Sequence, residues 1–138
     1  MAKKEKKKII VATGKRKGAV ARAKLVEGTG KVKINSQPLE YWKNDYLRMR
    51  IKEPLIIAGD VAKKVNIFVN VVGGGFSSQT DAARMSIAKA LLGYSKSDDL
   101  SKKYIQYDRN LLVYDPRRNE PHKPGSSEPR AHKQRSKR

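Results

Sequence analysis

The order of apolar segments along the chain predicts an α+β domain with two layers. Alternating strand-type runs come first, a helical pattern follows, and a β-branched strand leads through three glycines into a second helical region. The 32 lysines and arginines and 13 carboxylates give the 138 residues a net charge of +19. We expect one folded domain, residues 9–114, between a basic leader, residues 1–8, and an extended basic tail, residues 115–138.

Positive charge is concentrated at the two ends of the chain. Residues 1–33 carry 12 basic and 2 acidic side chains, residues 34–106 carry 11 and 7, and residues 107–138 carry 9 and 4. Self-repulsion on this scale destabilises an isolated compact state, so a polyanionic partner would stabilise the fold. Nucleic acid and an anionic membrane surface are the partners that this charge indicates.

Several classes of protein are excluded by what the sequence lacks. Without cysteine the chain forms neither disulfides nor a cysteine-ligated zinc site, and we expect no metal and no cofactor. No apolar stretch reaches the length of a signal peptide or a membrane span, so we expect a cytoplasmic protein. The two histidines, His122 and His132, lie in the extended tail, which cannot hold a general base in position. We therefore expect no catalytic residues and no enzyme activity.

Strand-type patterns fill the start of the predicted domain. Residues 9–12 form a short apolar run, and residues 14–18, GKRKG, predict a turn between two glycines. Residues 19–26 and 31–35 alternate between apolar and cationic side chains, which predicts a β-meander with one buried face. Arginine at such exposed positions can bind phosphate through two hydrogen bonds. The cations that we expect to contact RNA from the hairpin tip and the outer face are Lys15, Arg16, Lys17, Arg22 and Lys24.

A helical pattern is expected in the middle of the chain. Pro38 suits the first position of a helix, and Trp42 and Tyr46 follow it at helical spacing. The apolar neighbours of Tyr41, Trp42 and Tyr46 favour a place in or just below the core over stacking on bases. Pro54 is expected to interrupt the pattern, and a short helical turn after it should stop at Gly59.

Three glycines, Gly73, Gly74 and Gly75, end the clearest strand pattern, residues 65–72. Backbone amides before a helix can bind phosphate, but no lysine followed by serine or threonine comes after Gly75, as a Walker loop requires. The spacing also differs from the dinucleotide-binding fingerprint. We interpret the loop as a structural turn, with contact to an RNA phosphate as the alternative.

Helices and then an extended tail are expected after the glycines. Ser78 and Asp81 resemble a capping box, Gly93 predicts the end of that helix, and residues 98–106 predict another. From residue 115 onwards the chain has nothing to bury that would offset the entropy of ordering. We expect this tail to be extended and free, or ordered only against a partner. The tail residues that we expect to contact RNA are Arg117, Arg118, Arg130, Lys133 and Arg135.

Several segments together carry a family resemblance. Residues 14–35, GKRKGAVARAKLVEGTGKVKIN, and residues 73–91, GGGFSSQTDAARMSIAKAL, resemble the small-subunit ribosomal protein nine family in its archaeal form. Residues 115–118, DPRR, and residues 136–138, SKR, are similar to the family's tail. Residues 122–132, HKPGSSEPRAH, depart from its pattern because they are less basic.

The resemblance implies a fold, a location and partners. The fold would be an α+β sandwich of the ribosomal protein S5 domain 2-like type. The protein would be a structural constituent of the small ribosomal subunit, cytoplasmic, bound to ribosomal RNA in the subunit head beside neighbouring head proteins, without a membrane partner. Its tail would reach the anticodon stem-loop of the tRNA in the P site during translation. The residues that match this tRNA-binding role are Ser136, Lys137 and Arg138.

Two further classes stay open when the residues are considered alone. A free RNA-binding module or RNA chaperone would show the same excess of positive charge. An enzyme that uses the glycine loop on a phosphorylated substrate is the other class, because α+β folds of this kind also host enzymes.

Overall fold

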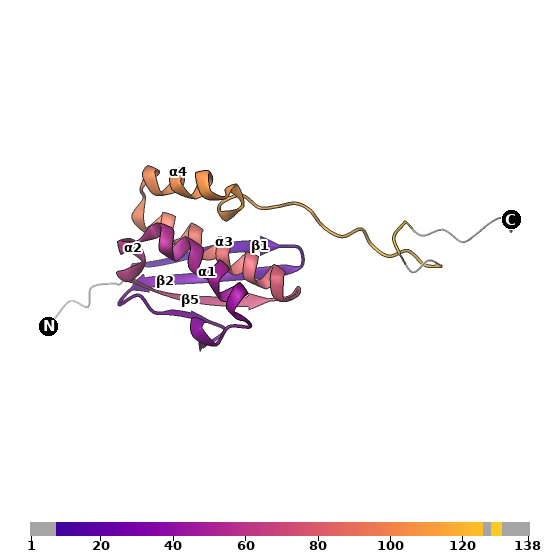
Figure 1. The fold of residues 1–138 in the computed structure, drawn as a ribbon, viewed down its shortest axis with the longest axis horizontal. Helices are drawn as coiled ribbons and strands as arrows, with labels where there is room; N and C mark the ends of the chain where they lie inside the picture. Colours follow the sequence, from indigo (N-terminus) through magenta and orange to yellow (C-terminus); the bar gives the residue numbers. More distant parts are fainter. Residues whose placement is uncertain (1–7, 126–127, 131–138) are drawn as a thin grey trace.

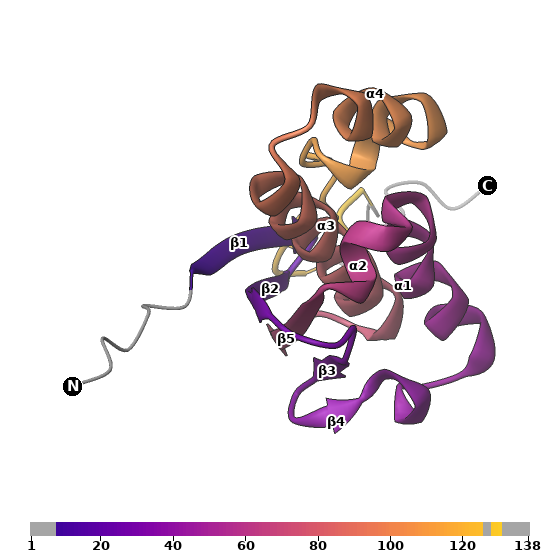
Figure 2. The same ribbon diagram turned by 90° about the vertical axis from the view of Figure 1, so that its left-hand side faces the viewer.

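A five-stranded sheet of order β1-β2-β5-β3-β4 forms one layer of the computed structural model, which describes residues 8–125 and 128–130. The strands are β1 Ile9–Arg16, β2 Ala19–Glu27, β3 Val32–Ile34, β4 Gln37–Pro38 and β5 Val65–Val72. The helices are α1 Asp45–Ala58, α2 Asp60–Lys63, α3 Phe76–Ser95 and α4 Asp98–Tyr107, with 3-10 turns at Leu39–Tyr41 and Arg109–Leu111. Helices pack on one face of the sheet, with α4 outside α3 (Figures 1 and 2), which confirms the predicted α+β class with two layers.

The first hairpin is tighter than the sequence predicts. β1 continues through Lys15 to Arg16, which pairs with Ala19, so the turn between the strands consists of Lys17 and Gly18 alone. The prediction of a turn over residues 14–18 was therefore wrong, because backbone pairing with β2 extends through three of its members. Lys17 has a positive φ of 51°, as a two-residue hairpin turn requires.

The predicted β-meander was also wrong, since β5 lies between β2 and β3. β2 pairs with β5 in antiparallel orientation, and β3 pairs with β5 in parallel orientation. The loop after β2 turns away across the start of β5, where the side chain of Asn66 accepts hydrogen bonds from the backbone of Thr29 and Lys31 at 2.9 and 3.0 Å. These bonds give the backbone N–H groups of the loop their hydrogen-bond partners. They hold the loop across β5, so that β3 pairs on the far side of that strand.

Helix α1 begins and ends differently from the predicted helical pattern. Pro38 lies in β4, and Asn44 caps α1 by accepting from the backbone of Leu47 at 3.0 Å. Pro54 lies inside α1 and does not end it. Ile51 and Pro54 are buried, Leu55 after them is partly buried against the core, and Tyr104 donates to the Pro54 carbonyl at 2.9 Å. The predicted stop at Gly59 is confirmed.

The aromatic residues before and within α1 divide between core and surface. Trp42 is buried, and its Nε1 donates to the hydroxyl of Thr80 at 3.2 Å. Tyr41 and Tyr46 are exposed. The expectation of a core role is therefore right for Trp42 and wrong for Tyr41 and Tyr46, because Tyr41 and Tyr46 lie on the exposed sides of the 3-10 turn and of α1.

Helix α3 is longer than its sequence signals indicate. It begins at Phe76 after Gly75 and ends at Ser95, where Lys96 takes the left-handed conformation. The proposed capping box and the stop at Gly93 were both wrong. Asp81 lies within the helix, where it is used in ion pairs, and Gly93 is simply its eighteenth residue in a helix of 20.

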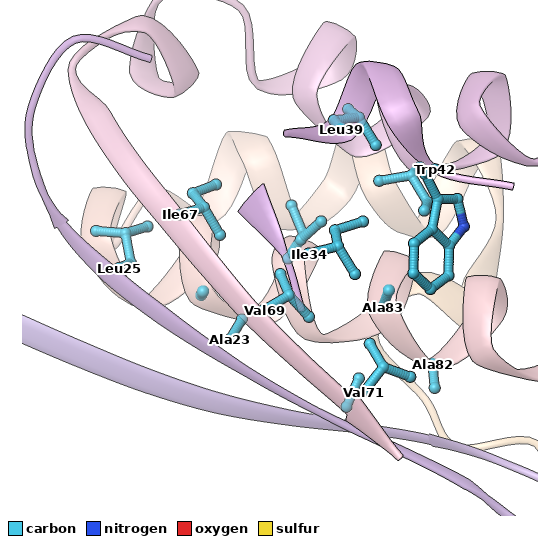
Figure 3. Packing of buried hydrophobic residues seen from close by; sticks show 14 of the residues in the cluster. Ala23, Leu25, Ile34, Leu39, Trp42, Ile67, Val69, Val71, Ala82 and Ala83 are labelled. Atoms are coloured by element: carbon cyan, nitrogen blue, oxygen red, sulfur yellow. The ribbon is translucent and has the colours of Figure 1, made fainter. Parts of the chain in front are cut away.

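Small residues bring α3 close to the sheet. A Cβ on Gly14 of β1 would lie 2.2 Å from the carbonyl oxygen of Ala82, so only glycine allows this approach. Ala23, Val69 and Val71 of the sheet face Ala82 and Ala83 of α3 in the core (Figure 3). Close packing of this kind holds the helices against one face of the sheet. The other face has no helix on it (Figure 2).

Candidate nucleic-acid interface

The open face of the sheet, which no helix covers, presents four cations. On β2, Arg22 and Lys24 are exposed while the alternate residues are buried, as the sequence predicts. Lys15 of β1 and Lys33 of β3 are exposed too, and the strand register places all four on this face. The described strand residues of the open face include no aspartate or glutamate. The strands therefore place no carboxylate beside Arg22, Lys24 and Lys33 on this face, whereas Lys15, at the end of β1, also lines the cavity that contains Asp81, Asp108 and Asp115.

The tail root, residues 115–117, is held against the end of β1. Asp115 forms an isolated parallel bridge with Arg16, and its carboxylate lies 3.3 Å from the Arg16 guanidinium. Arg16 also donates from Nη1 to the carbonyl of Arg117 at 3.3 Å. Arg117 in turn donates from its backbone N and its Nε to the Asp115 carboxylate at 3.1 and 3.0 Å. Two of the arginines expected to contact RNA are thus paired with the protein's own carboxylate.

Asp115 is the centre of the tail root. Its side chain is only 10% exposed, and both arginines converge on it. The hydrogen bonds from Arg117 lower the pKa of Asp115 from its ordinary value of 3.8 to about 2. The carboxylate is therefore charged at every physiological pH, and it neutralises part of the positive charge of Arg16 and Arg117.

Asp81 links the tail root to the helices. Its side chain projects from α3. One carboxylate oxygen lies 3.9 Å from Nε of Arg16, and the other forms an ion pair with Nη2 of Arg50 of α1 at 3.1 Å. β1, α1 and α3 therefore meet at one carboxylate, about a quarter of whose side chain is exposed. An ion pair with this exposure orients the side chains more than it stabilises the fold.

A buried arginine joins α3 to the neighbouring helices beside this point. Arg84 is 5% exposed and lies between two carboxylates, with Glu53 of α1 at 2.5 Å and Asp108 after α4 at 2.9 Å. A guanidinium removed from water is stable only when such partners satisfy it. No local pattern in the sequence points to a role for Arg84, and in the structure its charge holds α3 to α1 and to the residue after α4.

A cavity of about 220 Å³ lies between these ion pairs at the base of the tail. Cations and carboxylates both line it, among them Arg50, Arg84, Asp81 and Asp108. Carboxylates repel an anion and the arginines repel a metal ion, so the lining suits neither ligand. Within residues 8–125 and 128–130 no cluster of three or more histidines or carboxylates could hold a metal ion, and no helix is long and apolar enough to cross a membrane.

The glycine turn between β5 and α3 has a structural explanation. Gly73 and Gly74 have positive φ values of 74° and 66°. A Cβ on Gly73 would lie 2.5 Å from the carbonyl oxygen of Gly18, and one on Gly74 would lie 2.9 Å from the Cβ of Ala19. These residues must be glycine because the first hairpin packs directly against them. Contact between this turn, with Gly75, and an RNA phosphate stays a prediction.

The other predicted RNA-binding residues lie at the hairpin tip and along the tail. Lys17 is exposed in the β1–β2 turn, at the end of the sheet from which the tail leaves (Figure 1). Arg118 donates from Nε to the hydroxyl of Tyr114 at 3.1 Å, and Arg130 pairs with Glu120 at 2.5 Å. The predicted residues that fall outside the described part of the chain are Lys133, Arg135, Ser136, Lys137 and Arg138.

Sequence reasoning missed the carboxylates that determine which cations are free. Asp81 is expected as a helix cap, and neither Asp108 nor Asp115 is given a role. A signal for Asp115 exists in the sequence DPRR, since an acidic residue at the start of a basic tail can pair with the tail's own arginines. Asp81 and Asp108 pair with residues far away in sequence, and local patterns do not reveal such contacts.

An α+β domain with an open cationic sheet face and a cationic tail defines a class of small basic protein suited to structured RNA. Comparison with known proteins identifies the family within that class. Residues 14–138 match the model of the family described as ribosomal protein S9/S16. The chain is also 44% identical over 131 residues to the small ribosomal subunit protein uS9 of Methanococcus maripaludis and to that of Methanococcus vannielii. Each alignment covers 94% of this chain and 98% of the relative. The chain belongs to the ribosomal protein S9 family, whose members are structural proteins of the small ribosomal subunit, and the similarity to methanococcal proteins confirms the archaeal type.

Proposed function

We propose that this chain is the structural constituent of a small ribosomal subunit that binds ribosomal RNA in the subunit head and contacts P-site tRNA through its tail. The observation that carries the proposal is the family match, which extends from the first hairpin through the tail, residues 14–138. The ribosome would be its cytoplasmic location, and neighbouring head proteins its other partners. The domain, residues 9–114, would be bound first and the tail, residues 115–138, ordered against RNA.

Exposed cations support the RNA-binding part of this proposal. Lys15, Lys17, Arg22 and Lys24 are exposed, and phosphate contacts from such residues position a protein on RNA without reading its sequence. Arg118 and Arg130 are exposed along the tail, and Lys133 and Arg135 would continue the same contacts. For Arg16 and Arg117 we propose a different main role, which is to hold the tail root through Asp115.

Fractionation on a sucrose gradient tests the proposed location. A ribosomal protein should sediment with the small subunit and stay with it through a wash at moderate salt, whereas an RNA chaperone would spread through the fractions without ribosomes. Absence from the small-subunit peak would refute the proposal. Titration with nucleoside triphosphates tests the enzyme alternative, and we expect no saturable binding, because the glycine turn lacks the lysine of a Walker loop.

Removal of Ser136, Lys137 and Arg138 tests the tRNA contact separately. We expect subunit assembly to persist and P-site tRNA binding to weaken by about 1–3 kcal/mol, the scale of one charge-assisted contact. The loss should be similar for different tRNAs, because phosphate contacts carry no sequence information. Arg138→Lys should restore part of the affinity, since lysine keeps the charge without the planar fork. Affinity equal to the full-length protein on purified small subunits would exclude the tail end from the tRNA site.

A further inference from the structure

An exposed phenylalanine lies at the centre of the open face, between two lysines. Phe68 of β5 pairs directly with Lys24 of β2 on one side and with Lys33 of β3 on the other. Directly paired residues on one face of a sheet have their Cβ atoms about 5 Å apart. The Phe68 side chain is 42% exposed, so its ring is accessible from solvent with a cation on each flank.

Other large apolar side chains are exposed on the same face. Ile9 is 55% exposed, Val11 65% and Val72 53%, and the strand register places all three on the face that contains Phe68. Single exposed apolar residues are ordinary, but a group of them on one face indicates a surface that binds a partner. The helices leave this face uncovered in the described part of the molecule (Figure 2).

Charge selects the partner of this apolar surface. The open face has Lys15, Arg22, Lys24 and Lys33, and none of its described strand residues is a carboxylate. A protein partner would have to bring its own carboxylates to four cations, whereas RNA supplies a phosphate with every nucleotide. A base is also flat and apolar on its faces, which suits an aromatic ring. Together the charge and the ring favour RNA whose bases are accessible.

We propose that Phe68 stacks on an unpaired base of RNA, while Lys24 and Lys33 bind the phosphates on the two sides of that nucleotide. This inference rests on the proposed binding of ribosomal RNA and adds that the open face requires a single-stranded nucleotide. In an RNA duplex the bases already stack on one another, and a protein reaches mainly phosphates and 2′-hydroxyls. Stacking on Phe68 distinguishes an unpaired segment from a helix without reading its sequence.

Two matched phenylalanine variants test the stacking. The chain contains 2 phenylalanines, and Phe76 is 67% exposed at the start of α3, away from the open face. Phe76 also has a lysine beside it, with Nζ of Lys43 lying 4.5 Å from the ring centre. Phe68→Leu and Phe76→Leu therefore make the same chemical change beside a cation, one on the open face and one outside it.

The probes are an oligouridine of about 12 nucleotides and an RNA duplex of similar length, bound to the full chain. Phe68→Leu should weaken oligouridine binding by about 5- to 150-fold, the range that one base–aromatic stack provides. It should leave duplex binding and the salt dependence unchanged. Phe76→Leu should bind both probes like the wild type, and Phe68→Tyr should keep the affinity for oligouridine. Photocrosslinking of 5-iodouridine in the strand should modify Phe68 and not Phe76.

Several outcomes would overturn the inference. Wild-type affinity of Phe68→Leu for oligouridine would refute the stack, and an equal loss on single strand and duplex would indicate a general change of the surface. If Phe68→Leu misfolds by circular dichroism, the folded Phe68→Tyr protein and the crosslink still decide the matter. Loss of a head protein from subunits containing Phe68→Leu, with oligouridine binding intact, would assign the face to protein. A wild-type chain that binds neither probe and leaves the small subunit would refute the proposed function itself.

Discussion

The open face of the sheet and the tail root contain the same kinds of cations but use them differently. On the open face, Arg22 and Lys24 point to solvent with no carboxylate among the described strand residues beside them. At the tail root, Arg16 and Arg117 converge on Asp115, whose side chain is 10% exposed. The number of cations in a segment therefore does not measure its attraction for RNA, because carboxylates brought in by the fold neutralise part of it.

The burial of individual arginines shows the same difference between free and paired cations. Arg22 is exposed to water, which leaves its guanidinium free to bind phosphate, whereas Arg84 is 5% exposed and bound to two carboxylates. Exposed charges contribute little to stability and much to association, while a buried charge must be satisfied for the fold to persist. The basic side chains of this chain thus divide into those that are paired within the fold and those that are exposed to solvent.

The largest effect that we predict concerns Arg84 and Arg22. Arg84→Met should lower the free energy of unfolding by roughly 3 kcal/mol, the lower end of the cost of breaking a buried ion pair, because Glu53 and Asp108 lose their shared partner. Arg22→Met makes the same chemical change on the open face and should alter stability by less than about 0.5 kcal/mol. Urea unfolding of the free protein measures both values.

Equal free energies of unfolding for Arg84→Met and Arg22→Met would contradict the contrast between buried and exposed arginines. A loss in Arg84→Met that disappears when Glu53→Gln and Asp108→Asn are added would show that unpaired carboxylates cause it, as the geometry predicts. RNA affinity should change in the opposite order. Arg22→Met should bind RNA more weakly, whereas Arg84→Met should bind RNA nearly as the wild type does, under conditions in which the variant is folded.

The second prediction compares the two regions by their salt dependence. Replacing Arg22 and Lys24 with alanine should reduce the slope of log affinity against log salt by about 1.5 units, since each phosphate contact contributes roughly 0.7 to 0.9. Replacing Arg16 and Arg117 with alanine should reduce it by less than half as much, because both are paired with Asp115. Equal changes in slope, measured with one RNA over the same salt range, would show that the internal ion pairs open on binding.

Local patterns in the sequence predict which residues of β2 and β5 are buried and which are exposed. Alternation over residues 19–26 gives the buried and exposed faces of β2 correctly, and residues 65–72 match β5 at both ends. The helix over residues 98–106 is confirmed as α4, one residue longer. Periodicity depends on a buried and an exposed side of one segment, so it needs no knowledge of other segments.

Contacts between distant segments explain what the sequence did not predict. β3 joins the far side of β5 because Asn66 binds the loop after β2, and Pro54 is accepted within α1 because the helix packs on its neighbours. The tail root depends on Arg16 and Asp115, which are 99 residues apart in the sequence (115 minus 16). Pairing of this kind is visible only when the fold brings the two ends of the domain together.

The third prediction concerns a substitution that would leave the cations of the tail root unpaired, as they are on the open face. Asp115→Asn should remove the charge that neutralises Arg16 and Arg117, and amide exchange at Arg117 should become a few-fold faster because its backbone N now faces a weaker acceptor. RNA binding should depend more steeply on salt, since two arginines become available. Glu120→Gln is the control for amide exchange, because its partner Arg130 lies farther along the tail and exchange at Arg117 should not change. Unchanged exchange and an unchanged slope in Asp115→Asn would mean that Asp115 does not hold the tail root.

The smallest effect that we predict is the pH dependence of the tail root. The hydrogen bonds from Arg117 lower the pKa of Asp115 to about 2 in the folded protein, against an ordinary value of 3.8. A depressed pKa means that folding favours the charged form, so the contribution of Asp115 is fully present above about pH 4 and is lost as the pH falls toward 2. The carboxyl carbon shift of Asp115 should therefore titrate well below the ordinary midpoint of 3.8 in an NMR pH series. Arg117→Ala should move the Asp115 midpoint back toward its ordinary value, because the largest cause of the shift is removed. A midpoint for Asp115 at its ordinary value of 3.8 in the wild-type protein would show that the tail root is open in solution, and Arg16 and Arg117 would then be as free to bind phosphate as the cations of the open face.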